Sequence, residues 1–345
     1  MNSMERVLMA LDHKEADRVP VYPIMSGVTR RIINTTYKEW ATNPDICADA
    51  FLAARKKLDS DCIITLIDLS VECDAWGQKI IYPDSEAAHP DYSQFIIKDS
   101  EDYYNVEKAD YKSSKRMMMH IETCKKIVEN AKGEFPVIAF VFGPLGTLSM
   151  LRNQQEMYMD FYDDPDAVFY AATKVNETLK DYVRALMDTG IQGVMIDTLF
   201  SSGSIMRKDM WDDLEGALLE DLAHTIRSKN GLVMIHNCGE KPYIDQLIKR
   251  MKPDAVSFLF PPYDCVDFKE CKEKYGDVTT LIGCVSPSSA VIGSDESWMQ
   301  ECKDCIDDMA NGGGFILATG CEYPANAEIE RARYMVEIAK SYGKY

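Results

Sequence analysis

Eight short apolar runs, separated by longer amphipathic stretches, recur along this chain of 345 residues. They cover residues 19–24, 61–67, 135–143, 193–198, 232–237, 255–260, 279–285 and 315–320. Continuous apolar runs of this length are typical of strands that are buried on both faces. The stretches between them show helical spacing, as in 164–190, which begins at Asp164-Pro165 and ends at Gly190. This alternation predicts an α/β fold with a parallel sheet.

Eight strands that are mostly followed by helices favour a closed (β/α)8 TIM barrel, and we expect a single domain over 1–345. An open doubly wound sheet is the alternative. Its nucleotide-binding version is disfavoured because no Gly-rich turn follows the first run. Residues 68–115 are polar, rich in turns and too long for a simple loop. We expect this segment to be an excursion that covers the mouth of the barrel.

The composition excludes several classes of protein. With 46% hydrophobic and 27% charged residues, the chain resembles a soluble globular protein. We expect it in the cytoplasm and not in a membrane, because it has no apolar stretch of spanning length and its start lacks a signal-peptide core. A net charge of −18 argues against nucleic acid as a partner. The 11 cysteines have no framework spacing, so we expect mostly reduced thiols.

Three soft metal ligands stand where predicted strands end. His236 and Cys238 terminate the fifth run, and Cys321 follows the eighth. In a (β/α)8 barrel the carboxyl ends of all strands meet at one mouth, so these side chains can converge. Each thiol taken alone is more typical of a protein core. Together, two thiolates and one imidazole form a three-ligand zinc site with a vacant fourth position, which is typical of catalytic zinc.

Carboxylates point to the same mouth. Asp68 follows the second run and Asp197 the fourth, so both are candidate catalytic groups. Their alternative role is structural, as helix caps or loop anchors. Glu240 and Glu322 each lie within two residues of a proposed ligand, and either can occupy the fourth zinc position. Alternatively, both glutamates are solvent-exposed loop residues that do not bind metal.

The remaining motifs do not indicate a second functional site. The Cys302-x-x-Cys305 pair falls inside an acidic amphipathic stretch instead of at a helix start, which argues against a redox role. The glycines of 143–151 fit no phosphate-loop pattern. No nucleophile elbow and no dinucleotide-binding fingerprint occurs in the sequence.

At these residues the chain resembles the uroporphyrinogen decarboxylase superfamily and, within it, the zinc-dependent, corrinoid-linked methyltransferases. The resemblance extends over 4–23, 65–77, 142–151, 196–204, 235–247, 282–296 and 317–330. It implies a uroporphyrinogen decarboxylase-like barrel with zinc at His236, Cys238 and Cys321. Asp68 matches a pocket aspartate that occurs in both branches of the superfamily.

Two departures separate the chain from the decarboxylase itself. The decarboxylase carries an Arg-rich segment after its first strand that holds substrate carboxylates, whereas 23–32 has only Arg30 and Arg31, displaced along it. Near its last strand the decarboxylase has a glycine-flanked His, and this chain has Gly320-Cys321. The Cys in place of His favours a metal site.

The resemblance therefore implies an enzyme that moves a methyl group between a small compound and the cobalt of a corrinoid. The compound is an O- or S-methyl donor, such as a methoxylated aromatic, a methanol-type compound or a methyl thiol, or else a thiol acceptor. Decarboxylation of a tetrapyrrole or another carboxylate is the first alternative. A binding module that senses or carries a thiol or a corrinoid protein without turnover is the second.

The chain lacks the Asp-x-His-x-x-Gly motif that anchors cobalamin. We therefore expect the corrinoid to arrive on a separate protein that docks transiently over the barrel mouth, with 68–115 as the docking surface. The sequence is compatible with a homo-oligomer but does not specify one.

Overall fold

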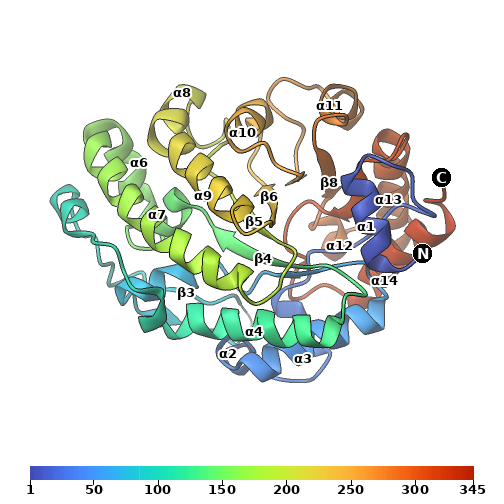
Figure 1. Cartoon of the computed structure of the whole chain (residues 1–345), viewed down its shortest axis with the longest axis horizontal. Coiled ribbons are helices and arrows are strands. Elements are labelled where there is room, and N and C mark those ends of the chain that lie inside the picture. Colours follow the sequence, from blue (N-terminus) through green and yellow to red (C-terminus); the bar gives the residue numbers. More distant parts are fainter. Residues whose placement is uncertain (85) are drawn as a thin grey trace.

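A parallel sheet of seven strands forms the centre of the computed structural model, which describes residues 1–84 and 86–345 (Figure 1). Along the sheet the strands are β1 (Ile63–Thr65), β4 (Val137–Phe142), β5 (Gly193–Asp197), β6 (Leu232–Asn237), β7 (Ala255–Phe258), β8 (Thr280–Val285) and β9 (Phe315–Thr319). All neighbours pair in parallel, so their carboxyl ends lie at one edge. Seven of the eight predicted runs are confirmed as strands.

The first predicted strand is the exception, because 19–24 forms only a single parallel bridge, between Val21 and Leu317 of β9. Pro20 and Pro23 have no N–H, so a regular ladder cannot form on both sides of this segment. The segment nevertheless joins the two sheet edges. The Tyr22 amide donates to the Leu317 carbonyl at 3.0 Å, and the Asp61 amide, just before β1, donates to the Val21 carbonyl at 2.8 Å. Residues 19–24 thus occupy the eighth position of the predicted barrel, whose architecture is confirmed.

Helices surround the strands (Figure 1). A typical one is α7, which starts where the Asp164 side chain accepts from the Ala167 amide and has Pro165 in its first turn. The helices are α1 (Ser3–Leu11), α2 (Tyr37–Thr42), α3 (Pro44–Leu58), α4 (Lys115–Ala131), α5 (Pro144–Ser149), α6 (Gln154–Asp163), α7 (Pro165–Met187), α8 (Lys208–Trp211), α9 (Ala217–Arg227), α10 (Ile244–Met251), α11 (Phe268–Tyr275), α12 (Ser289–Ile292), α13 (Asp295–Met309) and α14 (Ile329–Ser341). No helix in the described part of the chain is both long and apolar enough to cross a membrane.

Two apolar cores flank the strands, because successive strand residues point to opposite faces. The larger core lies between the strands and the helices, and the smaller one includes Phe140, Met195, Met234, Ile282 and Ile316. These five residues come from five different strands and are at most 5% exposed. The inside of the barrel is therefore packed with side chains, and room for a ligand is left at its mouth.

The predicted excursion over the mouth divides into two halves. The first half contains the antiparallel pair β2 (Ile80–Ile81) and β3 (His89–Pro90), and its residues 86–90 line a cavity at the mouth. The second half leaves the mouth and runs along outer helices, where Tyr103 donates to Asp160 of α6 at 2.9 Å. Only the first half is therefore positioned to contact a ligand.

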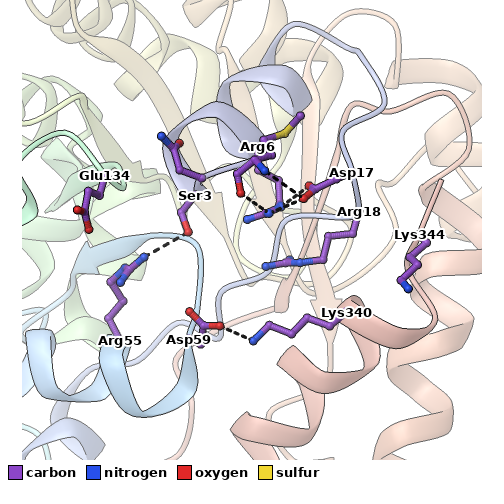
Figure 2. Close-up of a pocket in the computed structure, with 11 residues that line it drawn as sticks. Ser3, Arg6, Asp17, Arg18, Arg55, Asp59, Glu134, Lys340 and Lys344 are labelled. Carbon is purple, nitrogen blue, oxygen red and sulfur yellow. Dashed lines mark hydrogen bonds and ion pairs between the residues drawn. The ribbon is translucent and has the colours of Figure 1, made fainter.

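An ion-pair network at the opposite, N-terminal end of the strands fixes the segment that completes the barrel, and Figure 2 shows its Arg6, Asp17 and Arg18 side chains. Asp61 is fully buried and accepts from Arg6 at 2.7 Å and from Arg18 at 2.8 Å. It also accepts from the Val21 amide at 2.9 Å and from the Ser3 hydroxyl at 3.0 Å. One carboxylate thus joins α1, the 19–24 segment and the start of β1.

We predict that Asp61→Ala destabilises the fold by about 3–5 kcal/mol, because it leaves two buried guanidinium groups without their shared partner. Asp17→Ala is the matched control. It also removes a partner of Arg6, but the Asp17 side chain is 43% exposed, and such pairs contribute about 1 kcal/mol or less. Urea unfolding followed by circular dichroism measures both variants. Equal losses would show that Asp61 does not hold the barrel closed.

Candidate metal centre

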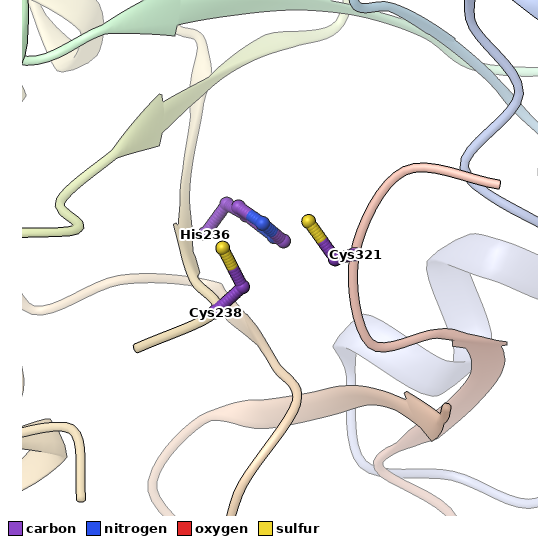
Figure 3. Close-up of side chains that lie close together, drawn as sticks. All are labelled: His236, Cys238 and Cys321. Atoms are coloured by element: carbon purple, nitrogen blue, oxygen red, sulfur yellow. The ribbon is translucent and has the colours of Figure 1, made fainter. Parts of the chain in front are cut away.

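The three predicted metal ligands come together at the mouth of the barrel (Figure 3). His236 is the penultimate residue of strand β6, Cys238 directly follows that strand, and Cys321 comes two residues after β9 ends. One ligand atom from each residue lies within 4.8 Å of the other two. His236 is buried and the two thiols are partly buried. The predicted convergence is confirmed, whereas the ion itself remains a prediction.

The donor set fits zinc. Zinc bonds of about 2.3 Å to sulfur and about 2.0–2.1 Å to nitrogen place tetrahedral donors roughly 3.5–4 Å apart, so small side-chain rotations bring these three atoms into range. Sulfur and imidazole donors also favour zinc over hard cations such as Mg²⁺ and Ca²⁺, which prefer oxygen ligands. Hydrogen bonding from Cys238 and from His236 holds the pKa of the Cys321 thiol well below its usual range. A thiolate, the form that binds metal, is thus already favoured at this position.

A hydrogen bond orients the imidazole ring. Nδ1 of His236 lies 3.1 Å from the hydroxyl of Ser257, which pairs with His236 in register on the neighbouring strand β7. The bond occupies Nδ1 and leaves Nε2 as the ligand atom, an arrangement typical of metal-binding histidines. We did not predict Ser257 from the sequence. The available signal was its position as the one polar residue in the buried run 255–260.

The turn that carries Cys238 is fixed by Asn237. The Asn237 side chain donates to the carbonyls of Thr198 at 2.7 Å and Ser201 at 3.1 Å. Its oxygen accepts from the Gly239 amide at 3.0 Å. Three buried bonds from one side chain therefore determine how the chain turns after β6, and with it the direction of the Cys238 thiol.

A close backbone approach places Cys321. A Cβ built on Gly320 would lie 2.6 Å from the Cα of Leu259, so this position accepts only glycine without a backbone shift. The Gly320 amide donates to the Val285 carbonyl at 2.8 Å, and the Tyr323 amide donates to the Ile24 carbonyl at 2.8 Å. The residue that precedes the third ligand thus sets the distance between the loops after β7 and β9.

Asp197 ends strand β5 and is paired in register with His236. Its carboxylate accepts from the Leu199 amide at 3.0 Å and faces the same cavity as the trio. Burial raises the pKa of Asp197 to about 7. The carboxyl group can therefore donate as well as accept a hydrogen bond near neutral pH.

Asp68 lines the cavity as well, but its oxygens are already engaged. Arg116 of α4 contacts both of them, at 2.8 and 2.5 Å, and Ser70 donates to one through its hydroxyl at 2.8 Å. Burial opposes ionisation of Asp68, yet the Arg116 charge and these bonds lower its pKa below the usual value. Asp68 is therefore a paired carboxylate that shapes the wall. Sequence reasoning missed Arg116, which lies in an ordinary amphipathic helix start.

The two predicted candidates for the fourth ligand position differ in location. Glu322 lines the cavity, and burial raises its pKa to about 7. Glu240 is exposed and is not among the described residues of the lining. Within the described chain, the closely grouped ligand atoms are those of the trio alone, so Asp197 and both glutamates lie outside that group.

These residues surround a cavity of about 370 Å³, within the range of small-molecule sites. Its walls include Phe140, Met150, Leu199 and residues 86–90 of the excursion, and the trio and Asp197 are part of its lining. The fold and the site thus define an α/β barrel protein with a candidate metal centre beside a small-molecule cavity.

Comparisons with known proteins agree with this architecture. The family model for uroporphyrinogen decarboxylase (URO-D) matches residues 2–342, so the chain belongs to the uroporphyrinogen decarboxylase family. Curated relatives named uroporphyrinogen decarboxylase are 21% identical in Actinobacillus succinogenes and 22% identical in Pseudoalteromonas atlantica. The alignments cover 99% of this chain and 97% and 98% of those proteins.

Solved structures share the fold. A methyltransferase from Methanosarcina mazei superposes with a TM-score of 0.82 at 20% identity, over 99% of both chains. A B12-independent methionine synthase from Shewanella sp. W3-18-1 superposes with a TM-score of 0.55 at 12% identity, over 94% of this chain and 95% of the other. These likenesses confirm the predicted barrel.

We predict that Ser257→Ala weakens zinc binding about 10- to 100-fold, because the His236 ring loses the partner that orients it. Thr280→Ala is the control, since it removes a hydroxyl from the opposite end of neighbouring strand β8, where it donates to Ala10. Competition with a chromogenic chelator measures the zinc affinity of each protein. Native affinity in Ser257→Ala would contradict the role of this bond.

Proposed function

We propose that this protein is a zinc-dependent methyltransferase that moves a methyl group between a small compound and the cobalt of a separate corrinoid protein. The observation that carries the proposal is the trio of His236, Cys238 and Cys321 in the wall of a small-molecule cavity. Three protein ligands beside such a cavity leave the fourth position to a ligand from the cavity, as catalytic zinc requires. A structural zinc would instead be closed by a fourth protein ligand.

Bound at the trio, zinc would supply a Lewis acid that favours the anionic form of a thiol or of a departing oxygen or sulfur group. The protein's own residues do the positioning. Ser257 and Asn237 hold the ligand side chains, as their hydrogen bonds show. Asp197 offers a carboxyl beside the trio that can hydrogen-bond a heteroatom in either protonation state. The apolar walls exclude water, which strengthens these polar contacts.

The uroporphyrinogen decarboxylase family and the methyltransferase fold both support an enzyme, and the decarboxylase names of the curated relatives keep decarboxylation as the second candidate. The structure gives one reason to prefer methyl transfer. Arg31 donates to the carbonyls of Ala325 and Ala327 at 3.1 and 2.6 Å, and Arg30 donates to that of Asp84 at 3.3 Å. Both arginines thus hold loops, and among described residues neither lines the cavity.

We also propose that a separate protein carries the corrinoid, since the sequence contains no cobalamin-anchoring motif. The cobalt-bearing face of the corrinoid would approach the cavity at the barrel mouth, where Tyr92 of the excursion is 66% exposed. We therefore propose the first half of the 68–115 segment as the docking surface for a transient complex.

We predict that the zinc-loaded protein converts the spectrum of a cobalt(I) corrinoid protein to that of the methylated form when the correct methyl donor is added. Cys321→Ala should lower this rate at least about 100-fold, because it removes a metal ligand. Cys305→Ala is the matched control, since Cys305 is buried in α13 away from the trio. Stopped-flow absorbance spectroscopy measures both rates. Metal-free decarboxylation that survives Cys321→Ala would contradict methyl transfer and favour the second candidate.

A further inference from the structure

The ionisable side chains that line the cavity, apart from the trio, are mostly of one kind. Asp68, Glu86, Asp197 and Glu322 contribute carboxyl groups to the lining. Among the residues that the structure describes, no lysine or arginine lines the cavity. A carboxyl group is negative or neutral but never positive, so these walls offer no cation to pair with an anionic ligand.

The nearby cationic groups are already engaged. Arg116 is 3% exposed and makes its bidentate pair with Asp68, so its charge is matched within the wall. Nδ1 of His89, the remaining basic ring of the lining, lies 2.8 Å from the Pro90 carbonyl. The ring also stacks on Tyr92 at a centroid distance of 4.6 Å and an angle of 5°. The imidazole is therefore engaged through Nδ1 and through one face of its ring.

The remaining walls suit a compact apolar molecule. Leu66, Leu69, Phe140, Met150 and Leu199 line the cavity of about 370 Å³. A divalent zinc ion with two thiolates and a neutral imidazole has no net formal charge. Such a centre binds a heteroatom directly, but it does not compensate a separate anionic group elsewhere on the ligand.

We propose that the small methyl donor or thiol acceptor of this site is uncharged apart from its reacting heteroatom and carries no carboxylate, sulfonate or phosphate group. The class that fits best is a neutral aromatic methyl ether, or a neutral thiol in the reverse direction. An anionic group would lose its hydration in the cavity without gaining a partner. It would also lie near the carboxyl groups of Glu86, Asp197 and Glu322, which repel an anion when they are ionised. This inference rests on the proposed function and narrows its substrate class.

Two matched pairs of compounds test the proposal through binding. In the first pair, 2-mercaptoethanol and 2-mercaptoethanesulfonate differ by an anionic sulfonate, and binding is followed by the thiolate-to-metal absorption of the cobalt(II)-substituted protein. In the second pair, 2-methoxyphenol and 4-hydroxy-3-methoxybenzoate differ by a carboxylate, and calorimetry on the zinc-loaded protein follows binding. We expect the neutral member of each pair to bind at least about 10-fold more tightly. The sulfonate or carboxylate of the other member would have no cationic partner in the cavity and would lie near carboxyl groups.

A charge reversal at the mouth supplies the control. Glu86→Lys places a cation in the exposed part of the lining and should reduce the preference for the neutral member of each pair about 10-fold. Glu134→Lys makes the same change in net charge at the N-terminal end of the barrel, where Glu134 lines a different pocket, and should leave the preference intact.

The outcomes separate the two hypotheses. Equal or tighter binding of both anionic compounds to the wild-type protein would overturn the inference and leave the methyltransferase proposal standing. If Glu134→Lys reduced the preference as much as Glu86→Lys does, the effect would come from net charge, and the inference would also fail. Absence of binding by all four compounds would overturn the inference, because the compound class that it names would not bind, and the cobalt(I) assay would still decide the proposed function.

Discussion

The site depends on the parallel register of the central strands. Asp197, His236 and Ser257 occupy paired positions on β5, β6 and β7, so main-chain hydrogen bonding alone sets them side by side. In a parallel sheet the carboxyl ends of the strands share one edge, and side chains at equivalent positions share one face. A carboxyl group, a candidate metal ligand and the partner that orients this ligand are thereby aligned by the strands themselves.

The third ligand depends on the way in which the barrel closes. Cys321 follows β9, and β9 and β1 are the two ends of the sheet, which the 19–24 segment joins with one bridge and two prolines. This segment is held at the opposite end of the strands by buried ion pairs of Asp61 with Arg6 and Arg18. The segment that lies beside β9, the strand before Cys321, is thus anchored at the end of the strands opposite the candidate metal centre.

Much of this arrangement was predictable from the sequence, and the physical reason is periodicity. Seven apolar runs became strands, and the trio met because strands of one barrel end at one mouth. The 19–24 segment was mispredicted as a regular strand because apolar composition indicates burial, whereas Pro20 and Pro23 decide the hydrogen bonding.

Side-chain partners were harder to predict. The contact between Asp68 and Arg116 joins residues 48 positions apart, and neither position signals the other. The contact between His236 and Ser257 depends on strand register, which apolar patterning does not specify. Asp68 was therefore correctly placed at the mouth, but its pairing with Arg116 could not be foreseen.

The proposed function depends on one requirement, a single zinc ion held by the two sulfurs and the imidazole nitrogen of the trio. X-ray absorption at the zinc edge of the purified protein measures this coordination directly. The account predicts one zinc per chain with two sulfur neighbours at about 2.3 Å and nitrogen or oxygen neighbours at about 2.0–2.1 Å. Protein that binds no zinc, or zinc whose coordination contains no sulfur, would contradict it.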